Sequence, residues 1–145
     1  MKSFDTNVAL YGINADCPEH EPCRRILERA RTEEGGWIVA DQVWLELYRL
    51  LRNPAVLSRP LDARRAADAV AWYRSRTGLH CAWDPELMPR LHERWRDADF
   101  PARRSFDLVL ALTLAANGVT EFYTRNSADF DSLGLFAVMD PLTAR

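Results

Sequence analysis

The sequence predicts an α/β fold of three layers, in which a short parallel sheet lies between two layers of helices. Two features support this prediction. Short β-prone runs alternate with helical segments along the chain, and glycine or proline marks most of the junctions. Strands separated by helices pair in parallel, because each helix carries the chain back across the sheet. The 145 residues, 48% of them hydrophobic, suit one domain spanning residues 1–145 around a single core.

The expected strands are short β-prone runs, and they lie at residues 2–4, 36–40, 79–83, 120–124 and 135–139. The expected helices have apolar side chains at helical spacing, and they cover residues 7–14, 21–30, 41–51, 61–78, 85–97 and 103–118. The helix over 85–97 is expected in spite of its internal Pro89. This order of elements is the alternation that the fold class requires.

Capping and breaking residues set the boundaries of these elements in chain order. The pair Gly35–Gly36 ends the second helix and begins the strand after it. Asp41 is the expected N-cap of the next helix, which stops before Asn53–Pro54. The following helix is capped by Asp62 and ended by Gly78.

The charge of the chain gives no clear indication of a partner. The formal net charge is −2, and Lys2 is the only lysine. The remaining basic residues are arginines, gathered at 24–25, 29–31, 64–65, 94–96 and 103–104. Arginine clusters suit phosphate, but on amphipathic helices they are more often solvated faces, and both interpretations stay open here.

Cysteine content and hydropathy indicate a cytoplasmic protein. Three cysteines are too few for a disulfide framework, which favours a reducing compartment. No apolar stretch of signal-peptide type opens the sequence, and the longest apolar run, residues 108–112, is too short to cross a bilayer. We therefore expect no membrane association.

Asp107 is the first residue that the fold alone does not explain. It lies three, four and seven residues before Leu110, Ala111 and Leu114, so it shares their inward face. Burying a lone carboxylate is costly unless the charge is paired or binds a cation. Its position in the first turn, where negative charge is favoured, is the alternative explanation.

Two further carboxylates raise the same question. Asp5 follows the strand at 2–4, and Glu46 borders the inward stripe of its helix, three residues after Val43. A structural role is open for each, because Asp5 could be an N-cap and Glu46 could reach an arginine. If the three converge, as the strand-end geometry of parallel sheets allows, a hard divalent cation such as Mg²⁺ would neutralise them. Such a site suits phosphodiester hydrolysis.

Four segments of the chain carry a family resemblance, in the expected order: "FDTNVALYGIN", "VWLELYRLLRNP", "SFDLVLALTLAANGVTEFYTRNSADF" and "VMDPL". Through these segments the sequence resembles the PIN-domain ribonucleases, in particular the VapC-type toxins of toxin–antitoxin pairs. It implies a PIN-like fold and a Mg²⁺- or Mn²⁺-dependent endoribonuclease. In the implied mechanism a metal-bound water attacks an RNA phosphodiester in line, without a covalent enzyme intermediate.

The resemblance also assigns roles to residues. Asp5, Glu46 and Asp107 are implied to bind the metal, and Asp129 to be a further catalytic acid. The implied supporting polar residues are Thr6, Asn7, Thr124 and Asn126. Many relatives have an aspartate where this chain has Asn126, which lowers the negative charge of the site by one and puts a second metal ion in doubt. Three arginines are expected to help position RNA: Arg103, Arg104 and Arg125.

The implied partners are an RNA substrate, a cognate VapB-like antitoxin and a second copy of the chain in a homodimer. The antitoxin is expected to lay a tail across the acidic groove, with an arginine inserted among the carboxylates. Apolar helix faces between residues 41 and 76 are the expected docking surfaces.

Other functions remain as alternatives. A PIN-like nuclease of RNA maturation, or a module that binds RNA or protein without cleaving, fits much of the same pattern. The segment "CPEHEPC" offers Cys17, His20 and Cys23 for zinc, but a polar turn with Cys23 packed inward is favoured. Trp72 and Trp95 are expected to pack rather than to stack on bases. A phosphorelay receiver or an aspartyl phosphatase is excluded, because a lysine near the site and a second aspartate at position 7 are missing.

Overall fold

The computed structural model describes residues 1–144 and contains the predicted parallel strands. They are three residues each: β1 (Lys2–Phe4), β2 (Ile38–Ala40), β3 (Leu79–Cys81), β4 (Glu121–Tyr123) and β5 (Ala137–Met139). One sheet has the order β1-β4-β5 and the other pairs β2 with β3, and every pair is parallel. A single parallel bridge between Lys2 and Trp37 connects the two. All five strands were expected, and each is shorter than or equal to its predicted run.

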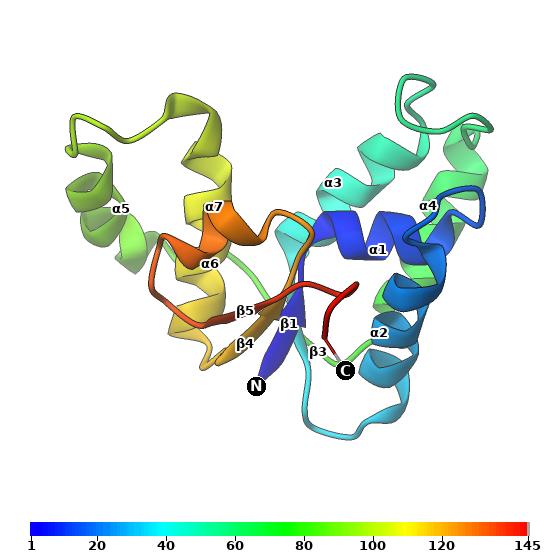
Figure 1. The fold of residues 1–145 in the computed structure, drawn as a ribbon, viewed down its shortest axis with the longest axis horizontal. Helices are drawn as coiled ribbons and strands as arrows, with labels where there is room; N and C mark the ends of the chain where they lie inside the picture. The colour runs from blue at the N-terminus through cyan, green and yellow to red at the C-terminus, as the bar shows by residue number, and fades with distance from the viewer. Residues whose placement is uncertain (145) are drawn as a thin grey trace.

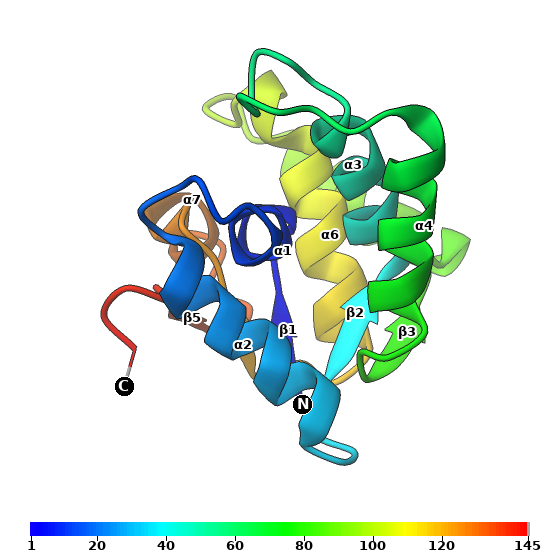
Figure 2. The ribbon, with the colours of Figure 1, turned by 90° about the vertical axis from the view of Figure 1, so that its right-hand side faces the viewer.

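Helices lie on both sides of the strands, as the three-layer prediction requires. Their bounds are α1 (Thr6–Ile13), α2 (His20–Thr32), α3 (Asp41–Leu51), α4 (Ala63–Arg74), α5 (Met88–Trp95), α6 (Ser105–Ala116) and α7 (Ser127–Asp131). Figure 1 shows α5, α6 and α7 on one side of the strands and α1 to α4 on the other. Seen from the side in Figure 2, α3 and α4 run beside one another, and α1 and α2 form a second pair.

The structure corrects several predicted boundaries. The third helix begins at Asp41 itself, with Ala40 as its N-cap, so Asp41 is not the cap. Pro89 is accommodated because the chain first makes a 3₁₀ turn at Pro85–Leu87, and Pro89 then falls in the first turn of α5, where no amide partner is lost. A second 3₁₀ turn, Ala102–Arg104, precedes α6. The short helix α7 was not expected.

Helix α6 joins two hydrophobic clusters. Leu110, Ala111 and Leu114 are buried in the main core, which also contains Phe4 and Phe122 from the strands. Leu108 and Leu112 on the opposite side of α6 pack in a smaller cluster with Leu87 and Leu91. A helix that is apolar all round is buried on more than one side, so α6 is a rigid central element. Its first turn is therefore held firmly in place.

A close approach between α1 and α2 fixes the first helical pair. A Cβ atom added at Gly12 would lie 2.6 Å from Leu27 Cδ1 and 3.2 Å from the backbone carbon of Cys23. Only glycine permits this spacing, which brings α2 directly against α1. The approach fixes α2 against the end of α1 that is farther from Asp5.

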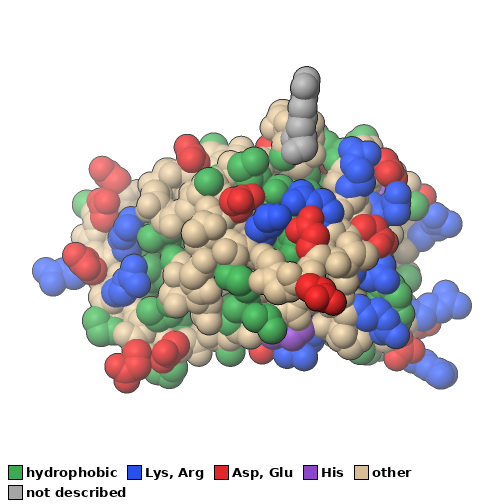
Figure 3. Space-filling view, turned by 90° about the horizontal axis from the view of Figure 1, so that it is seen from below, with side chains coloured by type: hydrophobic (Ala, Val, Ile, Leu, Met, Phe, Trp, Pro, Cys, Tyr) green, Lys and Arg blue, Asp and Glu red, His purple; other side chains and the backbone are tan. Residues whose placement is uncertain are grey.

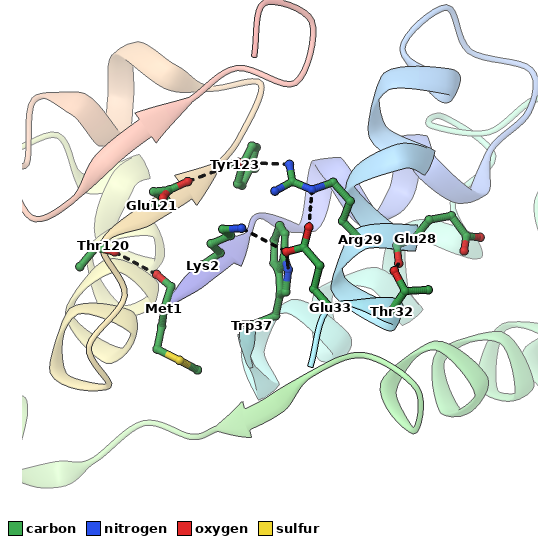
Figure 4. Close-up of polar contacts among 10 residues, drawn as sticks. All are labelled: Met1, Lys2, Glu28, Arg29, Thr32, Glu33, Trp37, Thr120, Glu121 and Tyr123. Atoms are coloured by element: carbon green, nitrogen blue, oxygen red, sulfur yellow. Dashed lines mark hydrogen bonds and ion pairs between the residues drawn. The ribbon is translucent and has the colours of Figure 1, made fainter. Parts of the chain in front are cut away.

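A charged cluster lies at the amino end of β1, beside the segment that precedes β2 (Figure 4). Glu33 accepts hydrogen bonds from Lys2 Nζ at 3.1 Å, Arg29 Nε at 2.8 Å and Trp37 Nε1 at 2.8 Å. These three bonds hold the pKa of Glu33 well below its ordinary value, at about 2. The cluster connects α2 to β1 and to the segment before β2, so its role is structural.

Within residues 1–144 no helix combines the length and the apolar character needed to cross a membrane.

Candidate active site

Asp5 lies directly after β1 and caps α1. Its side chain is 7% exposed and accepts three hydrogen bonds of 2.7 Å, from the Thr6 backbone nitrogen, Asn7 Nδ2 and Thr124 Oγ1. The N-cap role is therefore real. All three donors are neutral, however, so the negative charge of the carboxylate is solvated but not compensated.

Glu46 lies half-buried on α3 and faces the start of α1. Its Oε2 atom accepts a hydrogen bond of 2.7 Å from Thr6 Oγ1, and its Oε1 atom accepts one of 3.1 Å from Gln42 Nε2. The same Gln42 nitrogen donates to the backbone oxygen of Phe106 at 3.0 Å. Gln42 therefore ties Glu46 to the first turn of α6. No arginine pairs with Glu46 within the described residues, so that alternative is wrong.

Asp107 lies half-buried in the first turn of α6, one residue after the carbonyl that Gln42 binds. Burial raises its pKa, and the negative charges of Glu46 and Asp129 raise it further. Burial also raises the pKa of Asp5 to about 6, with smaller increases from Asp107 and Glu46 and with hydrogen bonds from Thr124 and Thr6 acting in the opposite direction. Carboxylates from β1, α3 and α6 thus lie near enough together to repel one another.

Asp129, on α7, lies close enough to Asp107 to act on its charge, and it has cationic neighbours. Its carboxylate is 3.6 Å from Arg104 Nε and 3.9 Å from Arg103 Nη1. Both arginines lower the pKa of Asp107, against the increase caused by burial. The fourth acid therefore belongs to the same neighbourhood, but its charge is partly compensated.

The predicted polar residues connect α1 to the end of β4. Thr124 Oγ1 donates to Asp5 and accepts from Asn7 Nδ2 at 3.3 Å and from the Asn126 backbone nitrogen at 3.0 Å. Asn7 Oδ1 accepts from the Arg125 backbone nitrogen at 3.2 Å. The Arg125 guanidinium, by contrast, pairs with Asp140 after β5. Arg125 therefore stands apart from the arginines of η2 (Ala102–Arg104) that face Asp129.

The donor set suits a hard divalent cation. Asp5, Glu46 and Asp107 offer carboxylate oxygens, the ligands that Mg²⁺ and Mn²⁺ prefer. The carboxylates of Asp5 and Glu46 are held only by neutral donors. Burial first, and then repulsion between carboxylates, raises the pKa of Asp5 and of Asp107, and a bound cation would relieve that repulsion. Among residues 1–144, no three His, Cys, Asp or Glu side chains have the arrangement of a formed metal site. The fit to a cation therefore rests on the chemistry of these oxygen donors and on the electrostatic effect of Asp107 and Glu46 on Asp5.

Comparison with known proteins decides the family. Residues 3–134 match the PIN domain family. The chain is 40% identical to Ribonuclease VapC24 of Mycobacterium tuberculosis, over 99% of both chains. The chain belongs to the PIN-domain family, in its VapC group.

Solved structures of PIN domains agree with this fold. VapC20 of Mycobacterium tuberculosis, described as a toxin that cleaves the sarcin–ricin loop, matches with a TM-score of 0.70 and 18% identity over 93% of this chain and 96% of that one. VapBC2 of Rickettsia felis, bound to a promoter DNA fragment, matches with a TM-score of 0.68 and 15% identity over 96% of this chain and 97% of that one. At such identities the likeness concerns the fold.

Sequence reasoning missed Gln42 as part of this PIN domain's site. Its contact with Glu46 has a sequence signal, because the two residues are four apart on one helix. Its second contact, with Phe106, has none, since it joins residues 64 positions apart. Only the packing of α3 beside α6 reveals it.

The cysteine-containing segment of the PIN domain forms a turn, as favoured. Cys17 Sγ donates to the Asn14 carbonyl at 3.2 Å, and His20 Nδ1 bonds to the Tyr11 carbonyl at 3.0 Å. Cys23 is fully buried, and burial raises the pKa of its thiol to about 12. These contacts engage the side chains in a structural turn.

Most outer arginines of the PIN domain behave as a solvated face. Figure 3 shows charges of both signs interspersed over the face seen from below. Arg24 and Arg25 pair with Glu21, and Arg74 pairs with Asp41.

Two tryptophans that were expected to pack are less buried than that expectation implies, because Trp72 and Trp95 are each 40% exposed. Trp72 has the guanidinium carbons of Arg31 and Arg76 at 4.5 and 4.8 Å from its ring centre.

Proposed function

We propose that this PIN domain is a Mg²⁺- or Mn²⁺-dependent endoribonuclease that hydrolyses RNA phosphodiester bonds. The proposal is supported by the contacts of Asp5 and Glu46, which both bond to Thr6 and have neutral donors alone around them. It is also supported by the effect of Asp107 and Glu46 on the pKa of Asp5. The 40% identity to a protein named a ribonuclease supports the same chemistry.

Each residue has a defined role in the proposed reaction. Asp5, Glu46 and Asp107 hold the cation, which when bound activates water and shields charge on the phosphate. Thr124 and Asn7 fix the orientation of Asp5, and Thr6 fixes that of Glu46. Asn126 extends past β4 near the same edge, and Asp129 completes the acidic set from α7. These residues orient and neutralise, and none forms a covalent intermediate.

Cleavage assays test the proposal directly. A labelled RNA should be cut by the protein with Mg²⁺ or Mn²⁺ and left intact with EDTA. Asp5→Asn and Asp107→Asn should each lower the rate by at least about a hundredfold, since a site built on one cation depends on its ligands. Asp131→Asn, a change of an exposed aspartate on α7, is the matched control and should cleave normally. Undiminished cleavage in EDTA or in both site variants would contradict the proposal.

The biological role that we propose is that of the toxin in a toxin–antitoxin pair. Two structures that share this fold, from Rickettsia felis and Haemophilus influenzae, are of VapBC assemblies. The proposed partner is a VapB-like antitoxin whose tail covers the acids, and the proposed location is the cytoplasm, where RNA and antitoxin are made. Expression of the chain alone should arrest growth, and co-expression with the product of a small adjacent gene should restore it. Growth without arrest, with cleavage intact, would favour RNA maturation.

A homodimer is the proposed assembly. Leu45 on α3 and Phe106 on α6 are each 73% exposed, although both are large and apolar. Between them lies a pocket of about 400 Å³ whose apolar lining includes Trp83 and Val109. An exposed apolar surface of this kind beside the site favours a second copy as its occupant.

A further inference from the structure

The proposed reaction leaves an electrostatic problem beside the site. Asp5, Glu46, Asp107 and Asp129 bring four carboxylates together, and one divalent cation compensates only half of that charge. An RNA backbone is itself anionic, so it needs cationic groups close to the acids. Arg125 already pairs with Asp140, so the cationic groups that could contact RNA are those on the η2 side of the site.

A small pocket on that side is lined by two arginines and a hydroxyl group. It has a volume of about 180 Å³ and contains Arg94 from α5, Arg104 from η2 and Ser132 after α7 in its wall. Arg104 Nη2 donates to Ser132 Oγ at 3.0 Å, and Arg94 Nη2 donates to the Leu133 carbonyl at 3.5 Å. The side chain of Arg104 is only 16% exposed, so its position is fixed by packing.

Arg94 and Arg104 differ in this pocket, because Arg104 has an ion-pair partner and two aspartates share the wall with them. Among the described residues, Arg94 has no carboxylate within 4.0 Å, and Arg104 reaches only Asp129. Asp97 and Asp99 also line the pocket, but neither pairs with the two arginines within that distance, and Asp97 Oδ1 accepts from the Asp99 backbone nitrogen at 3.1 Å. Among the described residues, Arg94 is therefore the guanidinium of this wall that is free to pair with an entering anion.

The pocket adjoins the acidic site through a shared residue. Arg104 lines the pocket and lies 3.6 Å from Asp129, and its charge acts on Asp107. An anion held by Arg104 and Arg94 would therefore sit beside the acids without touching them. Guanidinium forks and a hydroxyl group are suitable donors for a phosphate.

We propose that the pocket formed by Arg94, Arg104 and Ser132 is a phosphate subsite, which binds an RNA backbone phosphate flanking the one that is cleaved. Asp129 has a positioning role in it, because its ion pair holds Arg104 between the pocket and the acids. The inference rests on the proposed ribonuclease function and adds the surface by which the substrate is aligned.

Equilibrium binding of RNA without catalysis tests the subsite. The probe is a short fluorescent single-stranded RNA of mixed sequence, titrated in EDTA at several salt concentrations. Arg94→Gln and Arg104→Gln should each weaken binding by about tenfold at low salt, as expected for loss of a charged hydrogen bond. Each should also lower the salt slope by about 0.7. Arg96→Gln, which removes the same charge at the end of α5 but outside the pocket, is the matched control and should change both much less.

Two further measurements separate a subsite from a merely structural arginine. Arg104→Lys keeps the charge and should recover most of the salt slope. Calorimetry with Mn²⁺ should show that Arg104→Gln binds the ion as tightly as the parent chain or more tightly, because a cation beside Asp107 has been removed. A structural defect would instead weaken Mn²⁺ and RNA binding together, and Lys would not restore either.

The outcomes distinguish this inference from the proposed function. If Arg94→Gln and Arg104→Gln bind the RNA like Arg96→Gln, or if they weaken RNA and Mn²⁺ binding together, the subsite is wrong. If the parent chain neither binds Mn²⁺ nor cleaves RNA, the nuclease proposal fails, whereas the binding data in EDTA still judge the pocket.

Discussion

At the scale of single residues, Asp5 combines a structural and a chemical role. It caps α1 through the Thr6 amide, as an aspartate at a strand-to-helix turn commonly does. It also lies among other carboxylates, and burial raises its pKa to about 6. The cap stabilises the helix, while the buried charge destabilises the fold in the absence of a cation. Such a conflict is typical of a functional position.

The pH dependence of stability in metal-free protein follows from this. The pKa of Asp5 is raised from 3.8 to about 6 in the folded chain. The stability that the protonated Asp5 carboxyl contributes to the fold is therefore fully present below pH 3.8, and it is lost as the pH rises through about 6. The melting temperature in EDTA should therefore rise as the pH falls from 7 towards 5, by an amount equivalent to at most about 3 kcal/mol. Asp5→Asn should remove most of this rise. An equal rise in the variant would contradict the assignment to Asp5.

Gln42 supplies a second residue-scale prediction. It holds Glu46 by one hydrogen bond and the Phe106 carbonyl by another, so it sets the distance between α3 and the first turn of α6. Gln42→Leu should lower Mn²⁺ affinity about tenfold, the usual cost of losing a group that orients a ligand. Calorimetry measures the change, with Arg49→Gln on the exposed face of α3 as control. Unchanged affinity in Gln42→Leu would remove Gln42 from the site.

At the scale of elements, local patterns predicted the strands and most helices but not their exact ends. Alternation and capping by Asp62 are local signals, and the structure follows them. Gly78 does not end α4, which stops at Arg74; it precedes β3 with a positive φ of 52°. The N-cap of α3 at Ala40, in place of Asp41, and the short α7 are not encoded locally, because each depends on how the chain leaves a strand. That Asp5, Glu46 and Asp107 share one cation stays a prediction, which comes from a face pattern and a resemblance. The contacts of Gln42 and Arg104 with distant elements required tertiary structure.

The α1–α2 pair offers a prediction at this scale. Gly12→Val would place methyl groups against Leu27 and the Cys23 backbone, and it should destabilise the fold by about 1–3 kcal/mol through overpacking. Denaturant titration measures the change. Gly36→Ala is the control, because a Cβ there meets nothing closer than 4.0 Å, and it should remain within about 0.5 kcal/mol of the parent chain. Equal stability of the two variants would contradict the close approach of the helices.

At the scale of the whole molecule, the acidic edge is bordered on one side by an apolar surface and on another by the arginine pocket. The apolar surface contains Leu45 and Phe106, and the pocket contains Arg94 and Arg104. This arrangement would give separate surfaces to the proposed self-association and to the proposed RNA contact. The proposed cation site would lie between the two.

The proposed dimer is tested at the apolar surface. Leu45→Arg puts a charge into the proposed contact, so light scattering should report a monomer where the parent chain is a dimer. Val56→Arg, in the exposed segment after α3, is the control and should remain dimeric. A dimer of unchanged strength in Leu45→Arg would move the contact to another face.

The central claim is that Asp5, Glu46 and Asp107 share one divalent ion, and a calorimetric titration with Mn²⁺ tests it most directly. The account predicts binding by the parent chain and by Asp131→Asn, and loss of that heat in Asp107→Asn while the melting temperature of the metal-free variant is maintained or raised. Equal Mn²⁺ heats in the parent chain and in Asp107→Asn, or no heat in either, would contradict it.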